Sequence, residues 1–142
     1  MNAPAAAPKT RSAAAPAPSG AGLTITLPML AQGEHYAGIL LDDSGKLSHH
    51  LILVPGEFTG TWPKAQAWAQ ANGGELPTRR EQSLLFANLK QYFKTDDPYW
   101  SGEQSADAPS YAWYQWFHDG NQNSWSKDDK NRACLVRRVP IR

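Results

Sequence analysis

Residues 77–93 read PTRREQSLLFANLKQYF, and they contain the strongest local signal in the chain. Thr78 and Glu81 have the spacing of a helix capping box, in which each side chain accepts a bond from the other residue's backbone N–H. Pro77 keeps the residue before it extended. The following side chains recur at helical spacing and define one face: Leu84, Leu85, Asn88, Leu89 and Tyr92. This stretch predicts an amphipathic helix over residues 78–93.

The flanking sequence predicts a second helix and several strands. Thr61 can cap a helix with Pro63 in its first turn, and Gly73 ends it. Two apolar runs within residues 35–54 enclose a turn sequence at 42–46 and predict a β-hairpin. Other strands are predicted at residues 23–27, 99–101, 111–117 and 133–139. Because the helices lie between groups of strands, the predicted class is α+β, with two helices packed on a small, mostly antiparallel sheet.

The first 22 residues differ in composition from the rest of the chain. They contain nine alanines and four prolines, with no acidic and no aromatic residue. Such a sequence buries too little apolar surface to offset the entropy of ordering it. It is either a plain leader or an extended arm that becomes ordered on a partner, and it lacks the apolar core of a secretory signal. We therefore expect an N-terminal arm over residues 1–22 and a folded domain over residues 23–142.

Overall composition excludes several functions. The chain has 14 basic and 13 acidic residues, a balance unlike that of nucleic-acid-binding proteins. It has no apolar run long enough to cross a membrane. One cysteine permits neither an internal disulfide nor a zinc site with two thiolates. The motifs of nucleophile elbows and phosphate-binding glycine loops are absent from the sequence. We expect no enzymatic activity, cofactor, metal, nucleic acid or membrane insertion.

Residues 99–125 hold eight of the fifteen aromatic side chains. Alternation along 111–117 places Tyr111, Trp113 and Phe117 on one face and Tyr114 and Trp116 on the other. One face covers the core, so the second either packs under loops or forms a binding surface. The polar residues that follow suit hydrogen bonding to sugars or to a protein, although a plain polar loop is the simpler interpretation. The candidate ligand-binding residues are Tyr114, Trp116, His118, Asn121, Gln122, Asn123 and Trp125.

Other reactive side chains favour structural roles. His49 and His50 are neighbours on a predicted strand, so they point to opposite faces and do not readily chelate one ion. The remaining histidines, His35 and His118, are likewise interpreted as structural. Cys134 lies in an apolar strand and is interpreted as a small buried hydrophobe.

Charged pairs in the sequence favour ion pairs and solvated turns over ligand sites. The arginine pairs 79–80 and 137–138 are interpreted as partners of acids such as Glu81 and Glu103, or as simply solvated, rather than as anion sites. Asp128 and Asp129 are flanked by lysines, so we interpret them as a solvated turn rather than a calcium site.

Four segments in order carry a family resemblance: GELPTRREQ at 74–82, YWSGE at 99–103, YAW at 111–113, and residues 132–138. They resemble the DUF1566 (Lcl C-terminal-like) domains of bacterial and prophage proteins, in the C-type-lectin-like and formylglycine-generating-enzyme-like fold group. The hairpin at 34–55, with its HHLIL segment, is similar to the phage and prophage subgroup. The resemblance implies a C-type-lectin-like fold whose irregular region carries surface loops, and a role as a displayed binding module.

The resemblance and the composition together predict a non-enzymatic protein of a phage or prophage virion. It is expected to decorate the head or to associate with the tail, made in the bacterial cytoplasm without a signal peptide. Its predicted partners are capsid or tail proteins through residues 1–22, a glycan or protein of the host surface, and further copies of itself. Two alternatives stay open: a structural cement without an external ligand, and a divergent formylglycine-generating-type oxidase that uses Cys134.

Overall fold

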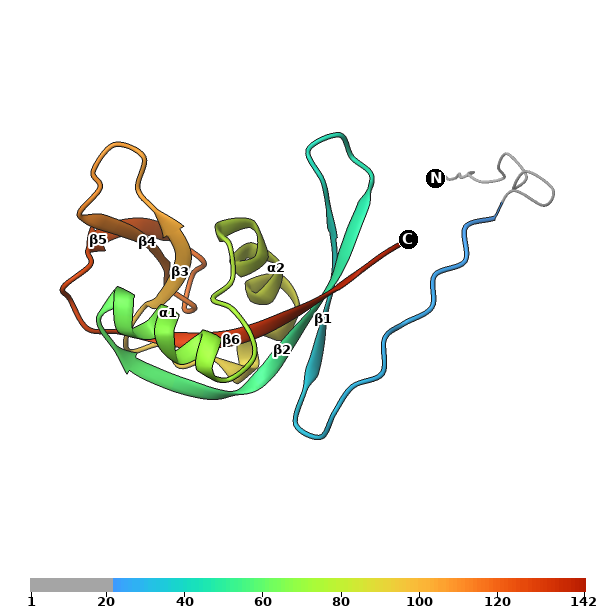
Figure 1. The fold of residues 1–142 in the computed structure, drawn as a ribbon, viewed down its shortest axis with the longest axis horizontal. Helices are drawn as coiled ribbons and strands as arrows, with labels where there is room; N and C mark the ends of the chain where they lie inside the picture. The colour runs from blue at the N-terminus through green and yellow to red at the C-terminus, as the bar shows by residue number, and fades with distance from the viewer. Residues whose placement is uncertain (1–21) are drawn as a thin grey trace, which may run out of the picture.

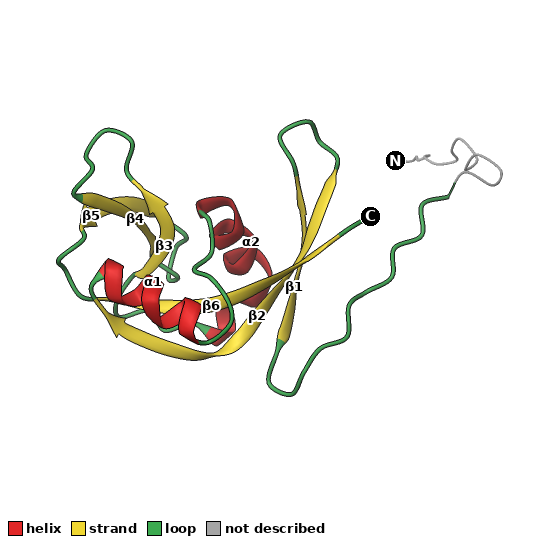
Figure 2. Ribbon diagram, in the orientation of Figure 1, coloured by secondary structure: helices red, strands yellow, loops and turns green. Residues whose placement is uncertain are grey.

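A computed structural model describes residues 22–142 of the chain. The predicted arm therefore lies outside the described residues, except for Gly22. The described part is an α+β domain in which two helices pack on a six-stranded mixed sheet (Figures 1 and 2). This confirms the predicted class. Within residues 22–142, no helix is both long enough and apolar enough to cross a membrane.

The sheet has the strand order β1-β2-β6-β3-β4-β5, and all neighbours are antiparallel except β3 and β6, which are parallel. The two longest strands, β2 and β6, pair along most of their length and cross the middle of the sheet (Figure 1). Strands β1 and β5 are its opposite edges. The strands are β1 (His35–Leu41), β2 (Leu47–Gly60), β3 (Tyr99–Gln104), β4 (Tyr111–Gln115), β5 (Gln122–Ser126) and β6 (Asn131–Pro140).

The predicted hairpin is confirmed as β1 and β2. Its turn is held by the Asp42 carboxylate, which accepts bonds from the backbone N–H groups of Ser44 at 2.9 Å and Lys46 at 3.0 Å. Strand β2 continues beyond the predicted end to Gly60, past a bulge between Val54 and Glu57. The apolar run at 51–54 lies between β1 and β6, as its continuous pattern predicts.

Both predicted helices form. Helix α2 (Arg79–Leu89) begins with the predicted capping box and continues as the short 3₁₀ helix η2 (Lys90–Tyr92). Helix α1 (Trp62–Ala71) begins after Thr61, with Pro63 in its first turn. The expected cap by the Thr61 side chain is wrong, because that side chain makes no capping bond. Instead, the Trp62 indole N–H donates to the Ser101 carbonyl at 2.8 Å and fixes the start of the helix against β3.

The helices cover opposite faces of the sheet, as the alternation along β6 shows. Cys134 and Val136 belong to a core cluster with residues of α2, and Ala133 and Leu135 belong to a second cluster with residues of α1. Successive side chains of a strand point to opposite faces. Figure 2 shows α1 and α2 on the two sides of β6. The loop after α1 approaches β6 closely at Gly74, where a Cβ would lie 2.7 Å from the Val136 carbonyl oxygen.

Two strand assignments differ from the predictions. Residues 23–27 form no strand, because no neighbouring strand of the described chain pairs with them, and alternation alone supplies no hydrogen-bonding partner. Residues 122–126, predicted as a polar loop, form the edge strand β5 against β4. Strand β4 ends at Gln115, two residues before the predicted end.

Candidate functional site

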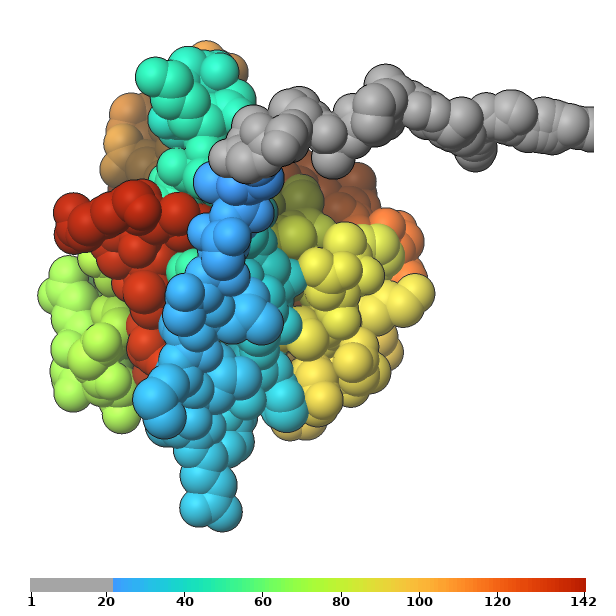
Figure 3. All heavy atoms as spheres, turned by 90° about the vertical axis from the view of Figure 1, so that its right-hand side faces the viewer, coloured from blue at the N-terminus to red at the C-terminus, as the bar shows by residue number. Residues whose placement is uncertain are grey.

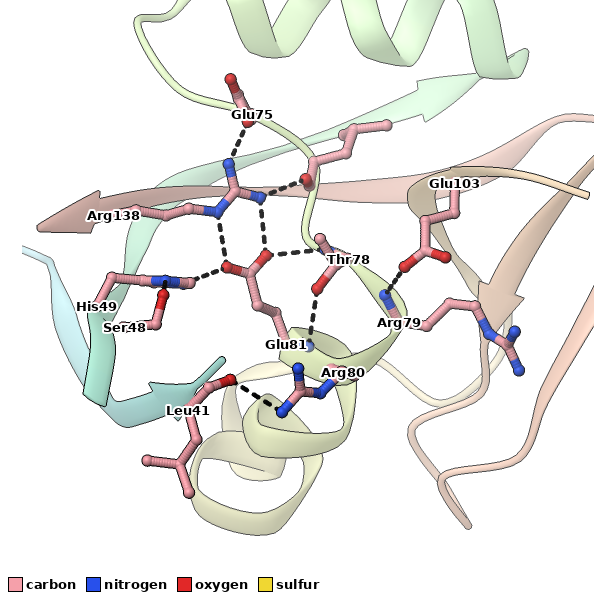
Figure 4. Close-up of polar contacts among 11 residues, drawn as sticks. Leu41, Ser48, His49, Glu75, Thr78, Arg79, Arg80, Glu81, Glu103 and Arg138 are labelled. Carbon is pink, nitrogen blue, oxygen red and sulfur yellow. Dashed lines mark hydrogen bonds and ion pairs between the residues drawn. The ribbon is translucent and has the colours of Figure 1, made fainter. Parts of the chain in front are cut away.

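The first polar site lies at the start of α2, where the capping box fixes the Glu81 carboxylate. The Thr78 hydroxyl accepts from the Glu81 N–H at 3.1 Å, and Glu81 Oε1 accepts from the Thr78 N–H at 2.8 Å. Figure 4 shows this carboxylate turned toward β6 and β2. The sequence signal that starts the helix therefore also orients an acidic group inside the domain.

Arg138 of β6 and His49 of β2 complete the shell around Glu81. The guanidinium donates to both oxygens, from Nε to Oε2 at 2.6 Å and from NH2 to Oε1 at 2.8 Å. His49 Nε2 lies 2.7 Å from Oε2. Arg138 also contacts Glu75 on the outer side (Figure 4). We call Glu81, Arg138 and His49, with Thr78, the Glu81 cluster.

The electrostatics of the Glu81 cluster favour a structural role over catalysis. Glu81 is 1% exposed, and burial by itself raises the pKa of its carboxyl group. The bonds from Arg138, from the Thr78 backbone and from His49 outweigh burial and hold that pKa below its ordinary value. Both oxygens are occupied by donors, so the carboxylate is ionised and is not free to take a proton. The cluster therefore ties β2, α2 and β6 together.

The structure confirms the predicted arginine ion pair with Glu81 and refines the others. Arg138 pairs with Glu81, whereas Glu103 accepts from the backbone N–H of Arg79 rather than from its guanidinium. Arg137 forms two bonds of 2.8 Å with Glu34. The Glu34 pairing was not predicted, because the two residues are 103 positions apart in the sequence.

The histidines and the aspartate pair are placed as follows. His49 and His50 point to opposite faces, as predicted: His49 reaches Glu81, and His50 Nδ1 lies 2.7 Å from the Tyr36 hydroxyl. His35 stacks on Tyr92. Residues 22–142 contain no group of three His, Cys, Asp or Glu side chains arranged to hold a metal. In the turn after β5, Asp128 is exposed as predicted, whereas Asp129 is half-buried.

Shallow hollows flank the Glu81 cluster on two sides. One, of about 340 Å³, lies between the β1–β2 hairpin and α2 and includes His49, Arg80 and Glu103 in its lining. The other, of about 280 Å³, lies against α1 and includes Gln66 and Gln70. Arg138 lines both. Most of the charged groups around them are already bonded: Arg138 pairs with Glu81, Arg80 lies 3.5 Å from Asp43, and Glu103 accepts from the Arg79 backbone N–H.

The second candidate site is the β4–β5 pair, whose two faces have different roles. On the face toward α2, the Arg79 guanidinium lies 3.5 Å from the centre of the Trp113 ring. Gln122 Nε2 donates to the Arg79 carbonyl at 2.7 Å and to Gln115 Oε1 at 2.9 Å. Gln122, a predicted ligand-binding residue, therefore uses its amide to hold β5 against α2, and that amide is engaged within the domain.

The other face of β4–β5 retains most of the predicted ligand-binding residues. The register pairs Tyr114 with Asn123 and Ala112 with Trp125, so these side chains point away from α2. Trp125 is 53% exposed, while Tyr114 is 9% exposed and packs into the α1-side core. Tyr114 therefore offers little surface to a ligand. The covered position of its ring weighs against its predicted binding role, which stays a prediction.

Trp116, His118 and Asn121 lie at the end of the same face. Trp116 is half-buried against the α1-side core, and the exposed His118 ring packs on it edge to face at 5.3 Å between centroids. Asn121 is exposed, but its backbone closes the turn by accepting from the Trp116 N–H at 2.9 Å. The surface that results, hereafter the β4–β5 surface, consists of Trp116, His118, Asn121, Asn123 and Trp125.

Cys134 lies in the α2-side core, as predicted, and is 2% exposed. Burial raises the pKa of its thiol, and the nearby Glu57 carboxylate adds to that effect. The thiol is therefore protonated and shielded, which is contrary to what a nucleophile requires. This weakens the oxidase alternative.

A third polar group, around Glu57, had no signal in the sequence. Glu57 follows the β2 bulge, and its carboxylate accepts from the Tyr99 hydroxyl and pairs with Lys94 and Arg132, each at 3.4 Å. Burial raises the pKa of the Tyr99 hydroxyl, and the bond to Glu57 raises it further. These residues come from distant segments, so only the folded chain brings them together.

Comparison with known proteins adds no relative: no family model matches the chain, and no curated protein sequence matches it. The resemblance to DUF1566 domains therefore stays a prediction from the motifs themselves.

Proposed function

We propose that this protein is a non-enzymatic display module with a C-type-lectin-like fold, carried on the surface of a phage or prophage virion. The observation that supports this function best is that the two edges of the sheet carry different parts of the chain. The N-terminal segment enters at β1, one edge of the sheet, and the β4–β5 surface lies at the opposite edge (Figure 1). A module attached through its N-terminus then presents that surface away from the attachment point.

The chemistry of the β4–β5 surface suits a polar, ring-containing ligand such as a host glycan, or a polar protein surface. Trp125 offers an exposed ring for stacking, and Trp116 is held by the core beneath it. Large aromatic side chains with few rotatable bonds are common binding anchors. The amides of Asn121 and Asn123 add donors and acceptors beside the rings.

Attachment is assigned to residues 1–22, which on this proposal bind a structural protein of the head or the tail. Many copies then share one particle. The non-enzymatic part of the proposal is supported by the state of the polar groups. The Glu81 cluster is internally paired, and the Cys134 thiol is buried and protonated.

Binding to host cells tests the proposed surface. We expect Trp125→Ala to weaken binding of the particle to its host by about tenfold or more, since truncation of an aromatic anchor removes a large contact. Tyr111→Ala is the matched control, because Tyr111 is an exposed aromatic of the same strand pair on the opposite face. Equal binding by both variants would contradict the proposal. Particles that lose stability but keep host binding would support the structural-cement alternative.

A further inference from the structure

Residues 23–29 have the pattern of a β-strand that has no partner in the described chain. Apolar side chains occupy every second position, with threonines or a proline between them. Three of these side chains, Leu23, Leu27 and Met29, are exposed, and Met29 is 90% exposed. An exposed, alternating segment of this kind gains buried apolar area and backbone hydrogen bonds when it pairs with another strand. Figure 3 shows it as a ridge on the outside of the molecule.

Contacts at the base of this segment direct it away from its own edge strand. Arg137 of β6 donates to the Met29 carbonyl at 2.9 Å and forms two bonds with the Glu34 carboxylate. A turn follows, in which the Glu34 N–H donates to the Ala31 carbonyl at 3.1 Å. Arg137 lies on the same face of β6 as Leu135, the face opposite α2. Strand β6 is separated from β1 by β2, so these bonds hold the chain over that face of the sheet and not alongside β1.

The outer edge of β1 pairs with no strand among residues 22–142. Two of its backbone carbonyls, those of Ala37 and Leu41, accept side-chain bonds from Asn88 at 2.6 Å and Arg80 at 2.9 Å of α2. Strand β1 has seven residues and pairs with β2 alone among the described strands. In the 23–29 segment, Pro28 has no N–H to donate and the Met29 carbonyl already accepts from Arg137, so residues 23–27 are the part that is free to pair.

The side chains beside this edge on the sheet face opposite α2 include Tyr36 and Ile39, which are half-buried. Leu41 is exposed and lines the hollow beside α2. A strand added here would place its apolar side chains next to those of Tyr36 and Ile39.

We infer that residues 23–27 of one copy add as a strand to the outer β1 edge of a second copy. One chain carries both a strand-like segment and a strand edge that have no strand partner among the described residues, and its own geometry keeps the two apart. Two copies related by a twofold axis satisfy both needs at once, since each gives a segment and accepts one. The exchange also covers an edge that would otherwise be open to aggregation. The inference involves neither residues 1–22 nor the β4–β5 surface, so it goes beyond the proposed function and is independent of it.

The test measures the mass of the full chain in solution by light scattering across a concentration series. We expect a dimer for the unmodified chain and for Thr26→Asp, and a monomer for Leu27→Asp, with association weakened more than about tenfold. The two variants add the same charge at neighbouring positions on opposite faces of the segment. Circular dichroism checks that both fold. A monomeric unmodified chain, or a dimer that survives Leu27→Asp, would overturn the inference.

Hydrogen exchange on the same proteins locates the pairing. The exchange rates of the amides of residues 23–27 and of β1 are expected to rise together in Leu27→Asp and to stay slow in Thr26→Asp. If Leu27→Asp abolishes the dimer while the amides of β1 keep their exchange rates, the edge of β1 is not the acceptor and the inference is wrong.

Discussion

The Arg138 guanidinium of β6 donates hydrogen bonds to both carboxylate oxygens of Glu81 at the start of α2, at 2.6 and 2.8 Å. The two residues are 57 positions apart in the sequence. The same carboxylate closes the capping box with Thr78. A local helix-start signal and a long-range ion pair therefore meet in one side chain, and we expect the stability of the domain to depend on it.

Replacing Glu81 is expected to destabilise the fold strongly. Glu81→Gln leaves Arg138 without its buried counter-charge, which costs about 3–5 kcal/mol in free energy of unfolding. Glu75→Gln is the matched control, because Glu75 contacts the same guanidinium from an exposed position, and exposed pairs contribute about 0–1 kcal/mol. Urea denaturation measures both, and equal losses would contradict the assigned role of Glu81.

The contribution of Glu81 is also expected to depend on pH. Its pKa in the folded protein lies below the ordinary value of 4.5, so its stabilising effect is fully present above pH 4.5 and disappears as the pH falls through the folded-state pKa. The difference in unfolding free energy between the unmodified chain and Glu81→Gln should therefore shrink in acid, where the carboxyl group becomes neutral like the amide. A difference that is constant from neutral to acidic pH would argue against this.

Two aromatic side chains on the same face of β4–β5 should respond differently to truncation. Trp125→Ala is expected to change the free energy of unfolding by less than about 0.5 kcal/mol, since its ring is mostly exposed. Tyr114→Ala removes a buried ring from the α1-side core and should cost about 3 kcal/mol or more. Thermal or urea unfolding measures both. A large loss for Trp125→Ala would mean that the ring serves the fold rather than a ligand.

Cys134 is expected to be inert toward thiol reagents in the native protein. Burial keeps reagents out, and the raised pKa keeps the thiol protonated at neutral pH. A chromogenic disulfide reagent should label one thiol per chain in denaturant and almost none without it. Rapid native labelling would restore the oxidase alternative, because it would show an accessible thiolate.

Local chemistry made much of this fold predictable. The capping box at Thr78 and Glu81 depends on a four-residue pattern, and the β1–β2 hairpin depends on an Asp-Asp-Ser-Gly turn between apolar runs. Both signals act within a few residues. The burial of Cys134 followed in the same way from its apolar neighbours.

Pairings between distant segments were not predictable. Strand β5 has few typical strand-forming residues, and it becomes a strand because β4 and the Gln122 amide bonds hold it. Residues 23–27 have a strand pattern without a partner in the described chain. For the candidate site, alternation placed Tyr114 and Trp116 on one face, but only the folded core shows that Tyr114 is covered while Trp125 is exposed.

The proposed attachment to a virion is tested most directly by the occupancy of the particle by a chain that lacks residues 1–22. Particles assembled with that chain are compared with particles carrying the double variant Trp116→Ala, Trp125→Ala. If residues 1–22 attach the module and the β4–β5 surface faces outward, the truncated chain is lost from the particle, and the double variant remains at full occupancy but no longer binds the host. Full occupancy by the truncated chain would contradict the account.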